Sequence, residues 1–522
     1  MDFSKMTLRE KIYQTFVTYP YHISKEGSIE NFFKKHPCGG VYFARGVVKD
    51  VAKEMESRTI VESEFIRDCR AAVDYPLLVC ADGANMKGHR GSVGSPVLAA
   101  AGDMQLAYDA GRAMGMMSNN GGVDVLMSPT IDMALSGGYC DDGRQATDDP
   151  ELNERLYRNI VRGIQAEGVA AMAKHFPGQS AYFVNCHYGP SHNTQSMEDW
   201  EATNGRCYRA VFEEGCMTVM NTHYTLKAWS DKSVGGRLPI ASYSEDINMG
   251  LLKGKLGFKG VLMTDALTMG GMATSDAAED AMLAFKAGAD LLLWPPMEAV
   301  DRIAEEIEKG NIPMSRLDDA LSRIQYLRDF LKYEGKERNY KPADTELIDR
   351  VYEEAVARAS TVVRNKLSTL PLSPEKQKKI LVVGCGRTEG EMKPLHEVVN
   401  AFKKRGFEVD FREYLLTCWE DEMREIHSPY DALIICYNVP VRSIEHYPDV
   451  ASTTWSSHLV PDEKAVFLNF GSQHLFDQYF PAASTFVNTN TFGVNPYIVE
   501  EVVARLCGEK EFEGHTTVKF NL

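Results

Sequence analysis

Residues 151–176 read ELNERLYRNIVRGIQAEGVAAMAKHF and join two patterns with different periods. In residues 151–168 the apolar side chains recur every three or four positions, which predicts an amphipathic helix. Residues 169–176 form a short apolar run of the kind found in buried strands. A helix that leads directly into a buried strand is typical of an α/β fold with a parallel sheet.

The same alternation extends in both directions from this segment. Eight short apolar runs precede residue 300: QTFVTYP (14–20), GGVYFA (39–44), PLLVCAD (76–82), VDVLMSP (123–129), VAAMAKHF (169–176), CMTVMNTH (216–223), GVLMTDA (260–266) and ADLLLWP (289–295). Eight strand–helix units in roughly 300 residues predict a closed (β/α)8, TIM-like barrel.

A second set of strands follows a polar segment, KYEGKERNYKPAD (332–344), whose Gly and Pro indicate a linker. The later runs are KKILVVGCG (378–386), EVDFREY (408–414), DALIICYNV (431–439), AVFLNFG (465–471) and STFVNTN (484–490). We therefore expect a catalytic barrel over residues 1–340 and a smaller, doubly wound α/β sandwich domain over residues 341–522.

The net charge and the cysteine pattern argue against several kinds of binding partner and binding site. The formal net charge is −16, which argues against nucleic acid and anionic membranes as partners. The 11 cysteines form no C-x-x-C pair, so we expect free thiols, no metal site and no cofactor. The charged N-terminus lacks the apolar run of a secretory signal, and we therefore predict a cytoplasmic protein.

Several predicted barrel strands end in a titratable side chain: Asp82, Lys174 with His175, His223 and Asp265. The carboxyl ends of barrel strands form the active-site face of this fold. A strand can also end at a polar residue without any functional reason. The recurrence of titratable side chains at several strand ends nevertheless favours a functional site.

The individual residues leave alternatives open. His187, in KHFPGQSAYFVNCHYGP (174–190), could transfer a proton or could be a structural loop histidine. Asp265 could attack an electrophilic carbon or could cap a helix. Arg90 and Arg144 could bind hydroxyl or carboxylate groups or could lie on the surface.

Taken together, these segments resemble the family 3 glycoside hydrolases, most closely the branch of bacterial β-N-acetylglucosaminidases. The segments that carry the resemblance are DGANMKGHR (82–90), MSPTIDM (127–133), DGRQATDDP (142–150), KHFPGQS (174–180) followed by NCH (185–187), and TDALTM (264–269). The resemblance runs from about residue 76 to 295 and more weakly to the C-terminus.

The resemblance implies a retaining mechanism in which Asp265 is the nucleophile and forms a covalent glycosyl-enzyme. The implied ligands of the terminal sugar are Asp82, Arg90, Arg144, Lys174 and His175, and we add His223 to the substrate-binding residues.

In this branch the general acid/base is a histidine on a mobile loop, paired with an aspartate two residues earlier. His187 stands at the histidine position, but Asn185 stands where the branch has aspartate. An amide can orient the ring but brings no negative charge, so we predict a less basic His187 and slower proton transfer than in typical members. Gln179 in place of a second histidine, and Ala84-Asn85-Met86 in place of E-G-G, are further departures near the implied sugar pocket.

Three kinds of function follow from the resemblance. The first is an exo-acting retaining glycoside hydrolase, of the β-N-acetylhexosaminidase kind, that removes a terminal β-linked sugar, with N-acetylglucosamine as the leading substrate. The second is a β-glycoside phosphorylase or β-glucosidase on the same scaffold; in the glucosidase branch a Glu of the second domain is the acid, and Glu445 is a candidate. The third is a non-catalytic sugar-binding protein, against which the retained Asp265 argues. The expected partner is a small carbohydrate or glycoconjugate, and the chain could form a homodimer.

Overall fold

The computed structural model describes residues 1–43, 64–83, 86–88, 91–135, 144–182, 184–272, 274–439 and 447–520, with only the backbone for residues 86–88 and 91–92. Contacts divide the chain into two compact units. Unit 1 comprises Met1–Ala84, Ala107–Tyr139 and Asn153–Thr345, and unit 2 comprises Asn85–Leu106, Cys140–Leu152 and Glu346–Leu522. A domain boundary near residue 340 remains our proposal.

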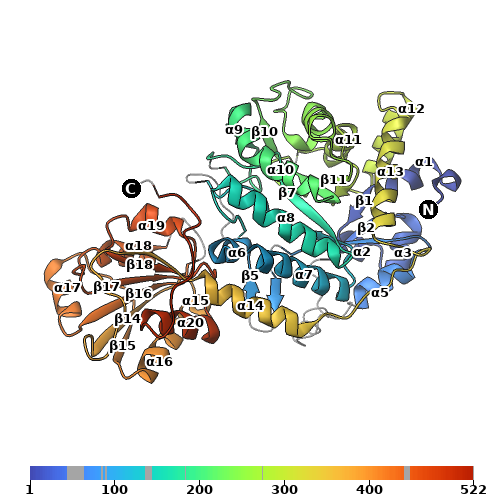
Figure 1. The fold of residues 1–522 in the computed structure, drawn as a ribbon. Coiled ribbons are helices and arrows are strands. Elements are labelled where there is room, and N and C mark those ends of the chain that lie inside the picture. Colours follow the sequence, from blue (N-terminus) through green and yellow to red (C-terminus); the bar gives the residue numbers. More distant parts are fainter. Residues whose placement is uncertain are drawn as a thin grey trace. The chain divides into compact units, whose positions relative to one another are not determined.

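Unit 1 contains a sheet of eight strands that pair in parallel (Figure 1). Their spatial order is β11 (Val261–Thr264), β9 (Thr218–Asn221), β7 (Ala170–Phe176), β6 (Val125–Met127), β3 (Leu78–Asp82), β2 (Gly40–Phe43), β1 (Phe16–Thr18) and β12 (Leu292–Leu293). The sheet closes because Met263 bridges Leu291, and the Thr264 amide donates to the Leu291 carbonyl at 3.0 Å. The eight predicted strands and the predicted (β/α)8 barrel are confirmed.

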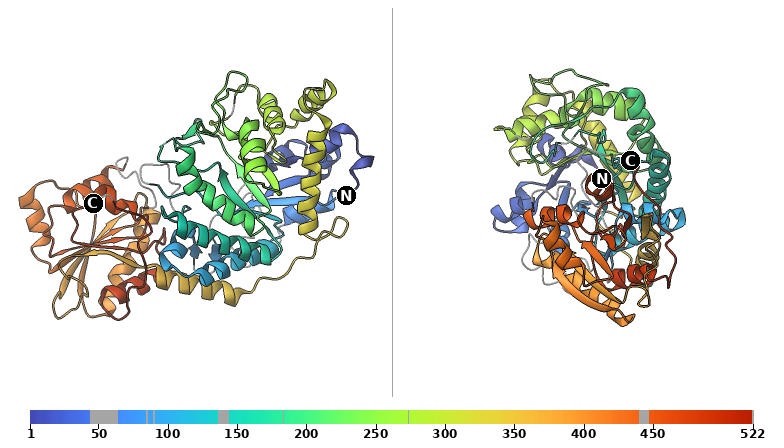
Figure 2. Two further views of the ribbon diagram at one scale, coloured as in Figure 1. Left: turned by 45° about the horizontal axis from the view of Figure 1, so that its top comes forward. Right: turned by 90° about the vertical axis from the view of Figure 1, so that its left-hand side faces the viewer.

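Helices surround this sheet (Figure 1 and Figure 2). They are α1 (Leu8–Tyr13), α2 (Pro20–Lys25), α3 (Ile29–Lys35), α5 (Glu64–Ala71), α7 (Met104–Asn120), α8 (Pro150–Ala166), α9 (Met197–Ala202), α10 (Asn204–Glu213), α11 (Ala277–Lys286), α12 (Ala299–Glu308) and α13 (Met314–Phe330). The same part of the chain includes η1 (Phe3–Lys5), η2 (Ala241–Tyr243), the π-helix η3 (Asp246–Lys255) and the paired strands β8 (Ser191–Asn193) and β10 (Tyr224–Leu226). The helix predicted over 151–168 is α8.

Alternate residues of the strands face the barrel interior. On β3, Leu78 and Cys80 belong to the interior cluster, and the next interior position is therefore Asp82, at the end of the strand. The same two-residue spacing links Met172 with Lys174 and Met263 with Asp265. The alternation that builds the core therefore also directs these three polar side chains toward the barrel mouth.

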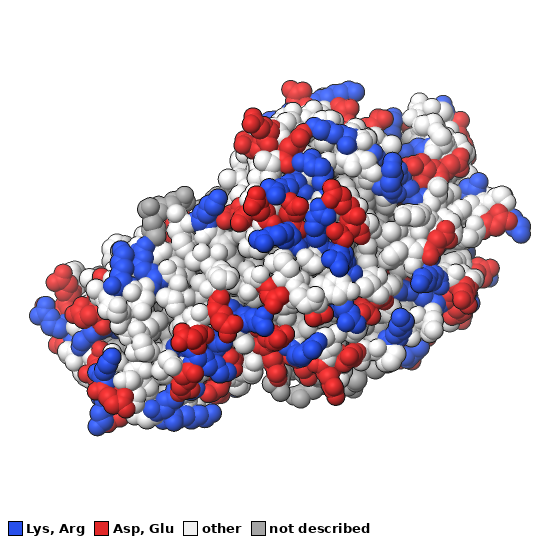
Figure 3. All heavy atoms as spheres, viewed as in Figure 1, with Lys and Arg blue, Asp and Glu red and all other residues white. Residues whose placement is uncertain are grey.

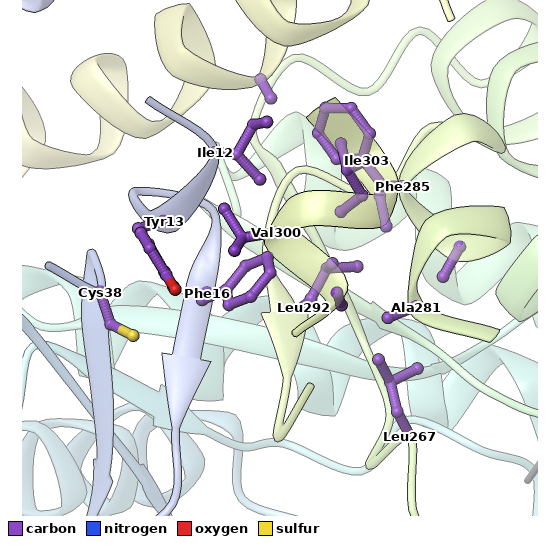
Figure 4. Close-up of a cluster of buried hydrophobic side chains, with 14 of the residues drawn as sticks. Ile12, Tyr13, Phe16, Cys38, Leu267, Ala281, Phe285, Leu292, Val300 and Ile303 are labelled. Atoms are coloured by element: carbon purple, nitrogen blue, oxygen red, sulfur yellow. The ribbon is translucent and has the colours of Figure 1, made fainter. Parts of the chain in front are cut away.

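The outer face of the sheet packs against the helices through large apolar side chains. Figure 4 shows Phe16 of β1 and Leu292 of β12 against Phe285 of α11 and Ile303 of α12. All four side chains are fully buried. Burial of each stabilises the fold by about 1.5–3 kcal/mol, so this contact holds α11 and α12 onto β1 and β12.

A buried carboxylate ties a later part of the chain to the amino end of the barrel sheet. Asp124 directly precedes β6 and is 0% exposed. Its oxygens accept hydrogen bonds from Val79 N (2.8 Å), Arg70 Nη2 (3.2 Å), Tyr333 Oη (2.8 Å), Arg338 Nη1 (2.5 Å) and Tyr340 Oη (3.1 Å). Residues 333–340, which the sequence indicated as a linker, are therefore bound to the barrel.

Unit 2 contains a six-stranded sheet. The strand order is β13 (Thr361–Asn365), β18 (Thr485–Asn488), β17 (Ala465–Asn469), β16 (Ala432–Tyr437), β14 (Lys379–Cys385) and β15 (Glu408–Glu413). The five predicted strands are present and parallel, whereas β13 is an antiparallel edge strand that was not predicted. Only Ser360 separates β13 from the preceding helix, so no turn signal marks its start.

Helices flank this sheet (Figure 1). They are α15 (Glu389–Met392), η4 (Lys393–Leu395), α16 (His396–Lys404), α17 (Glu420–His427), α18 (Pro448–Ser457), α19 (His474–Tyr479) and α20 (Pro496–Leu506). The remaining elements of unit 2 are the helices α6 (Ser95–Ala101) and α14 (Thr345–Ala359) and the antiparallel strands β4 (Met86–Gly88) and β5 (Gly91–Val93).

Charges of both signs are distributed over the surface. On the face shown in Figure 3, Lys and Arg side chains lie among Asp and Glu side chains. Of the helices within the described residues, none has both the length and the apolar character that a membrane crossing requires. The exclusion of nucleic acid and anionic membranes as partners stays a prediction from the net charge.

We expect Asp124→Ala to destabilise the barrel strongly, because two largely buried guanidinium groups and two tyrosine hydroxyls lose their shared acceptor. Removal of one member of a buried charge network costs about 3–5 kcal/mol, which corresponds to a fall of about 4–7 °C in the thermal midpoint of a barrel of about 340 residues. The control is Asp301→Ala, whose side chain is 59% exposed and pairs with Arg9. Equal midpoints for the two variants in a thermal melt would contradict this role of Asp124.

Candidate active site

The carboxyl ends of β3 and β7 are joined by an ion pair. Lys174 Nζ lies 2.6 Å from Asp82 Oδ1. The Lys174 side chain is 2% exposed, whereas that of Asp82 is 53% exposed. The buried ammonium thus holds a half-exposed carboxylate at the end of β3, and a carboxylate is a group that can accept hydrogen bonds from hydroxyl groups.

Asp265 follows β11 and is held at both carboxylate oxygens. The Thr222 hydroxyl donates to Oδ2 at 2.7 Å, and the Ala266 amide donates to Oδ1 at 2.8 Å. Burial raises the pKa of Asp265, but nearby His175 and His223 together with these two hydrogen bonds outweigh it, and the pKa is lowered overall. The carboxylate is therefore ionised at neutral pH, partly exposed, and chemically suited to attack a carbon that carries positive charge.

The ring of His175 is oriented by a buried carboxylate, Asp132. Asp132 Oδ2 accepts from the His175 amide at 3.1 Å and lies 2.7 Å from His175 Nδ1, and Oδ1 accepts from the Gln179 amide at 3.1 Å. This contact fixes a proton on Nδ1 and orients Nε2. Asp132 was not among the predicted site residues, although the MSPTIDM segment that contains it was recognised as similar to a family element.

His223 is fully buried and uses both ring nitrogens within the protein. Nδ1 lies 2.7 Å from Ser242 Oγ, and Nε2 lies 3.2 Å from the Ala266 carbonyl. Because a carbonyl only accepts, Nε2 carries the proton, and burial lowers the pKa of the ring. The prediction that His223 binds substrate therefore conflicts with its contacts, and we propose instead that it supports the turn after Asp265.

The loop that carries His187 is bonded to the segment that follows Asp265. His187 Nδ1 lies 2.7 Å from Asn185 Oδ1, so the amide oxygen accepts the Nδ1 proton and orients the ring. The amides of Gly270 and Gly271 donate to the carbonyls of His187 and Cys186, both at 2.9 Å.

Both glycines are required for this close approach. A Cβ atom on Gly271 would lie 2.5 Å from the Cys186 carbonyl oxygen and 2.8 Å from Cβ of His223. A Cβ atom on Gly270 would lie 2.8 Å from the Tyr188 carbonyl oxygen. Side chains at these positions would displace the loop.

Electrostatic interactions link several of the predicted residues of unit 1. Beside the larger effect of burial, Asp265 raises and His187 and His175 lower the pKa of His223, and Asp82 and Asp265 both raise the pKa of Tyr42 of β2.

Arg90 and Glu445 lie outside the described residues, and Arg144 belongs to unit 2, so their roles stay predictions. Among the described residues, no group of three His, Cys, Asp or Glu side chains is arranged to hold a metal ion.

Comparisons with known proteins identify the family. The model of the glycosyl hydrolase family 3 N-terminal domain matches residues 7–327. A beta-N-acetylglucosaminidase/beta-glucosidase of Cellulomonas fimi is 28% identical, with 86% of this chain and 84% of the relative covered. A beta-hexosaminidase of Methylobacillus flagellatus is 26% identical, and the match covers 36% of this chain and about half, 52%, of that relative.

The fold is also that of solved structures. The structure of the beta-glucoside phosphorylase BglX bound to 2FGlc superposes with a TM-score of 0.82 at 23% identity, covering 99% of this chain and 95% of that one. Together, the family match over most of the barrel and the shared fold show that this chain belongs to glycosyl hydrolase family 3.

Proposed function

We propose that the chain is an exo-acting retaining β-glycosidase in which Asp265 is the nucleophile and His187 the general acid/base. The observation that carries the proposal is the ionised Asp265 carboxylate at the barrel mouth, held at both oxygens and grouped with His175 and His187. A pure sugar-binding protein would have no need of such a carboxylate, which favours catalysis over binding alone.

The reaction proceeds in two steps. In the first, an Asp265 oxygen bonds to the anomeric carbon while the glycosidic C–O bond breaks, and His187 Nε2 donates a proton to the leaving oxygen. In the second, His187 accepts a proton from water, the water oxygen bonds to the anomeric carbon, and the Asp265 carboxylate leaves. The hydrogen bond from Nδ1 to Asn185 keeps Nε2 as the exchanging nitrogen in both steps.

The strand-end polar groups are suited to hold the terminal sugar. We propose that Asp82, Lys174 and His175 bind its hydroxyl groups, and that Arg90 and Arg144 contribute further contacts. Fixed contacts of this kind orient the anomeric carbon toward Asp265 and can lower the barrier by several kcal/mol. The names of the relatives favour a β-linked N-acetylglucosamine or a related hexose as the sugar. We propose that the substrate is a small oligosaccharide or glycoconjugate and that the protein acts in the cytoplasm.

A specific observation favours phosphorolysis as the second candidate. Asn185 contributes no negative charge next to His187, so an incoming phosphate anion would meet less repulsion there than beside an aspartate. The solved structure with the shared fold described above is named a beta-glucoside phosphorylase. Phosphate would then replace water in the second step, and the product would be a sugar 1-phosphate.

We expect Asp265→Gly to reduce kcat on an aryl β-glycoside by about 10⁴-fold or more, because the nucleophile is lost. Azide should restore part of the rate, since it can occupy the space left by the carboxylate, and the glycosyl azide should have the inverted anomeric configuration. The control is Asp231→Gly, which removes an exposed carboxylate. An azide product of retained configuration, or parental kcat in Asp265→Gly, would contradict the proposal.

Asn185→Asp should move the basic limb of the pH profile of kcat/KM upward by about one unit. The new carboxylate would stabilise protonated His187 and raise its pKa, so the acid form persists to higher pH. Asn185→Ala, which adds no charge, should show no upward shift. The profile is measured on a panel of aryl β-glycosides with and without phosphate, and an unchanged basic limb in Asn185→Asp would show that His187 is not the acid.

The same panel separates the two candidate reactions. Hydrolysis predicts turnover that is independent of phosphate, whereas phosphorolysis predicts a phosphate-dependent rate and a sugar 1-phosphate product. In the phosphorolytic case, Asn185→Asp should also weaken the apparent affinity for phosphate by about tenfold, because the added charge repels it.

Gly271→Ala should lower kcat/KM by about 10–100-fold without loss of the fold, because the added methyl group displaces the His187 loop by a fraction of an ångström or more. Gly189→Ala is a matched control in the same loop, since a methyl group there meets nothing within 4 Å. Equal kcat/KM values for the two variants would show that the contact between loop and turn does not position His187.

A further inference from the structure

We propose that Thr222 is a positioning residue for Asp265, and that its hydroxyl sets the plane of the carboxylate that meets the sugar. The inference rests on the proposed role of Asp265 as nucleophile and extends it to a residue that does not itself touch substrate. Thr222 directly follows β9, is 0% exposed, and donates to Asp265 Oδ2 at 2.7 Å.

Two anchors are needed because an aspartate carboxylate rotates easily about its last bond. The torsion to an sp² centre has broad wells, so the Ala266 amide on Oδ1 restrains only one oxygen. Thr222 supplies the second restraint from a neighbouring strand. Its β-branched side chain has a stiff χ1, and its amide is bonded to the Phe176 carbonyl at 2.9 Å, so the hydroxyl is itself held in place.

The direction of the Thr222 proton follows from its two neighbours. Thr222 Oγ1 lies 2.7 Å from Asp265 Oδ2 and 3.8 Å from Cys186 Sγ. Burial raises the pKa of Cys186 to about 12, so this side chain is a neutral thiol and a weak acceptor. The Thr222 hydroxyl has one proton and the ionised carboxylate is the stronger acceptor, so Thr222 donates to Asp265 and its contact with the Cys186 sulfur is secondary.

The contacts of Thr222 with Asp265 and with Cys186 connect the proposed nucleophile to the loop of the proposed acid/base, since Cys186 is the residue between Asn185 and His187. The connection adds to the backbone bonds from Gly270 and Gly271 to the same loop. A displacement of this loop would therefore also loosen the contact between Cys186 and Thr222. In this way the positions of Asp265 and His187, the two proposed catalytic groups, are coupled.

The titratable side chains that interact electrostatically with Asp265 come from several elements. They are His175 of β7, His223 beside Thr222, Cys186 of the loop, Tyr42 of β2 and Tyr224 of β10. Among the contacts described above, Cys186 is the one side chain of this set that meets the Thr222 hydroxyl. Because that contact is long, loss of the hydroxyl acts mainly on Asp265.

The test compares Thr222→Val, which removes the hydroxyl at nearly constant volume, with Thr222→Ser, which keeps it. For Thr222→Val we expect kcat to fall about 10–100-fold with KM within about twofold, because Thr222 is buried and makes no ground-state contact with sugar. The acid limb of kcat/KM should move to higher pH, because Asp265 loses a hydrogen bond that favours its ionised form. Thr222→Ser should recover most of kcat and the parental acid limb.

The matched control is Thr218→Val on the same strand, whose fully buried hydroxyl donates to the Ala171 carbonyl instead of a carboxylate. It should keep the parental acid limb. If Thr222→Val does not fold, as judged by its thermal midpoint, Thr222→Ala carries the same test.

A parental kcat and acid limb in the hydroxyl-free variant would overturn the role of Thr222, as would a fall in kcat that Thr222→Ser does not recover. Either result leaves the role of Asp265 intact as long as azide rescues Asp265→Gly with inversion. Failure of that rescue would instead overturn the proposed function itself.

Discussion

Every strand of the barrel sheet runs in the same direction, so the carboxyl ends of all eight strands meet at one mouth. The bridge between Met263 and Leu291 joins the two ends of the sheet, and the alternation of side chains decides which residues face inward. Asp82, Lys174 and Asp265 each lie two residues beyond a buried interior side chain. The chemistry of the site therefore depends on a packing rule that also builds the core.

The opposite end of the barrel uses carboxylates for stability. Asp124 and Asp290 each precede a strand, are fully buried, and accept a backbone amide from the neighbouring strand, at 2.8 Å from Val79 and 2.9 Å from Leu262. Asp290 also pairs with Lys253 at 2.7 Å. Buried carboxylates at this end are neutralised by cations, whereas Asp265 at the mouth stays partly exposed. The same residue type thus serves the fold at one end and, we propose, the reaction at the other.

Much of this arrangement could be predicted from the sequence because it depends on local periodicity. The eight barrel strands and the polar residues at their ends follow from patterns within a few positions. The role of Asp132 depends on contacts with residues 43 and 47 positions away, and the Thr222 contact joins residues 43 positions apart. The burial of both His223 nitrogens and the binding of residues 333–340 to Asp124 are likewise products of tertiary packing, which local patterns do not encode.

The central claim is that the Asp265 carboxylate forms a covalent bond to the anomeric carbon. The most direct test is mass spectrometry of the full chain after incubation with a 2-deoxy-2-fluoro-β-glycoside that carries a good leaving group, followed by fragmentation. The account predicts a mass increase of one fluorosugar, located on the peptide that contains Asp265 and missing in Asp265→Asn. A sugar attached to another carboxylate of the barrel mouth, or first-formed product of inverted configuration, would contradict it.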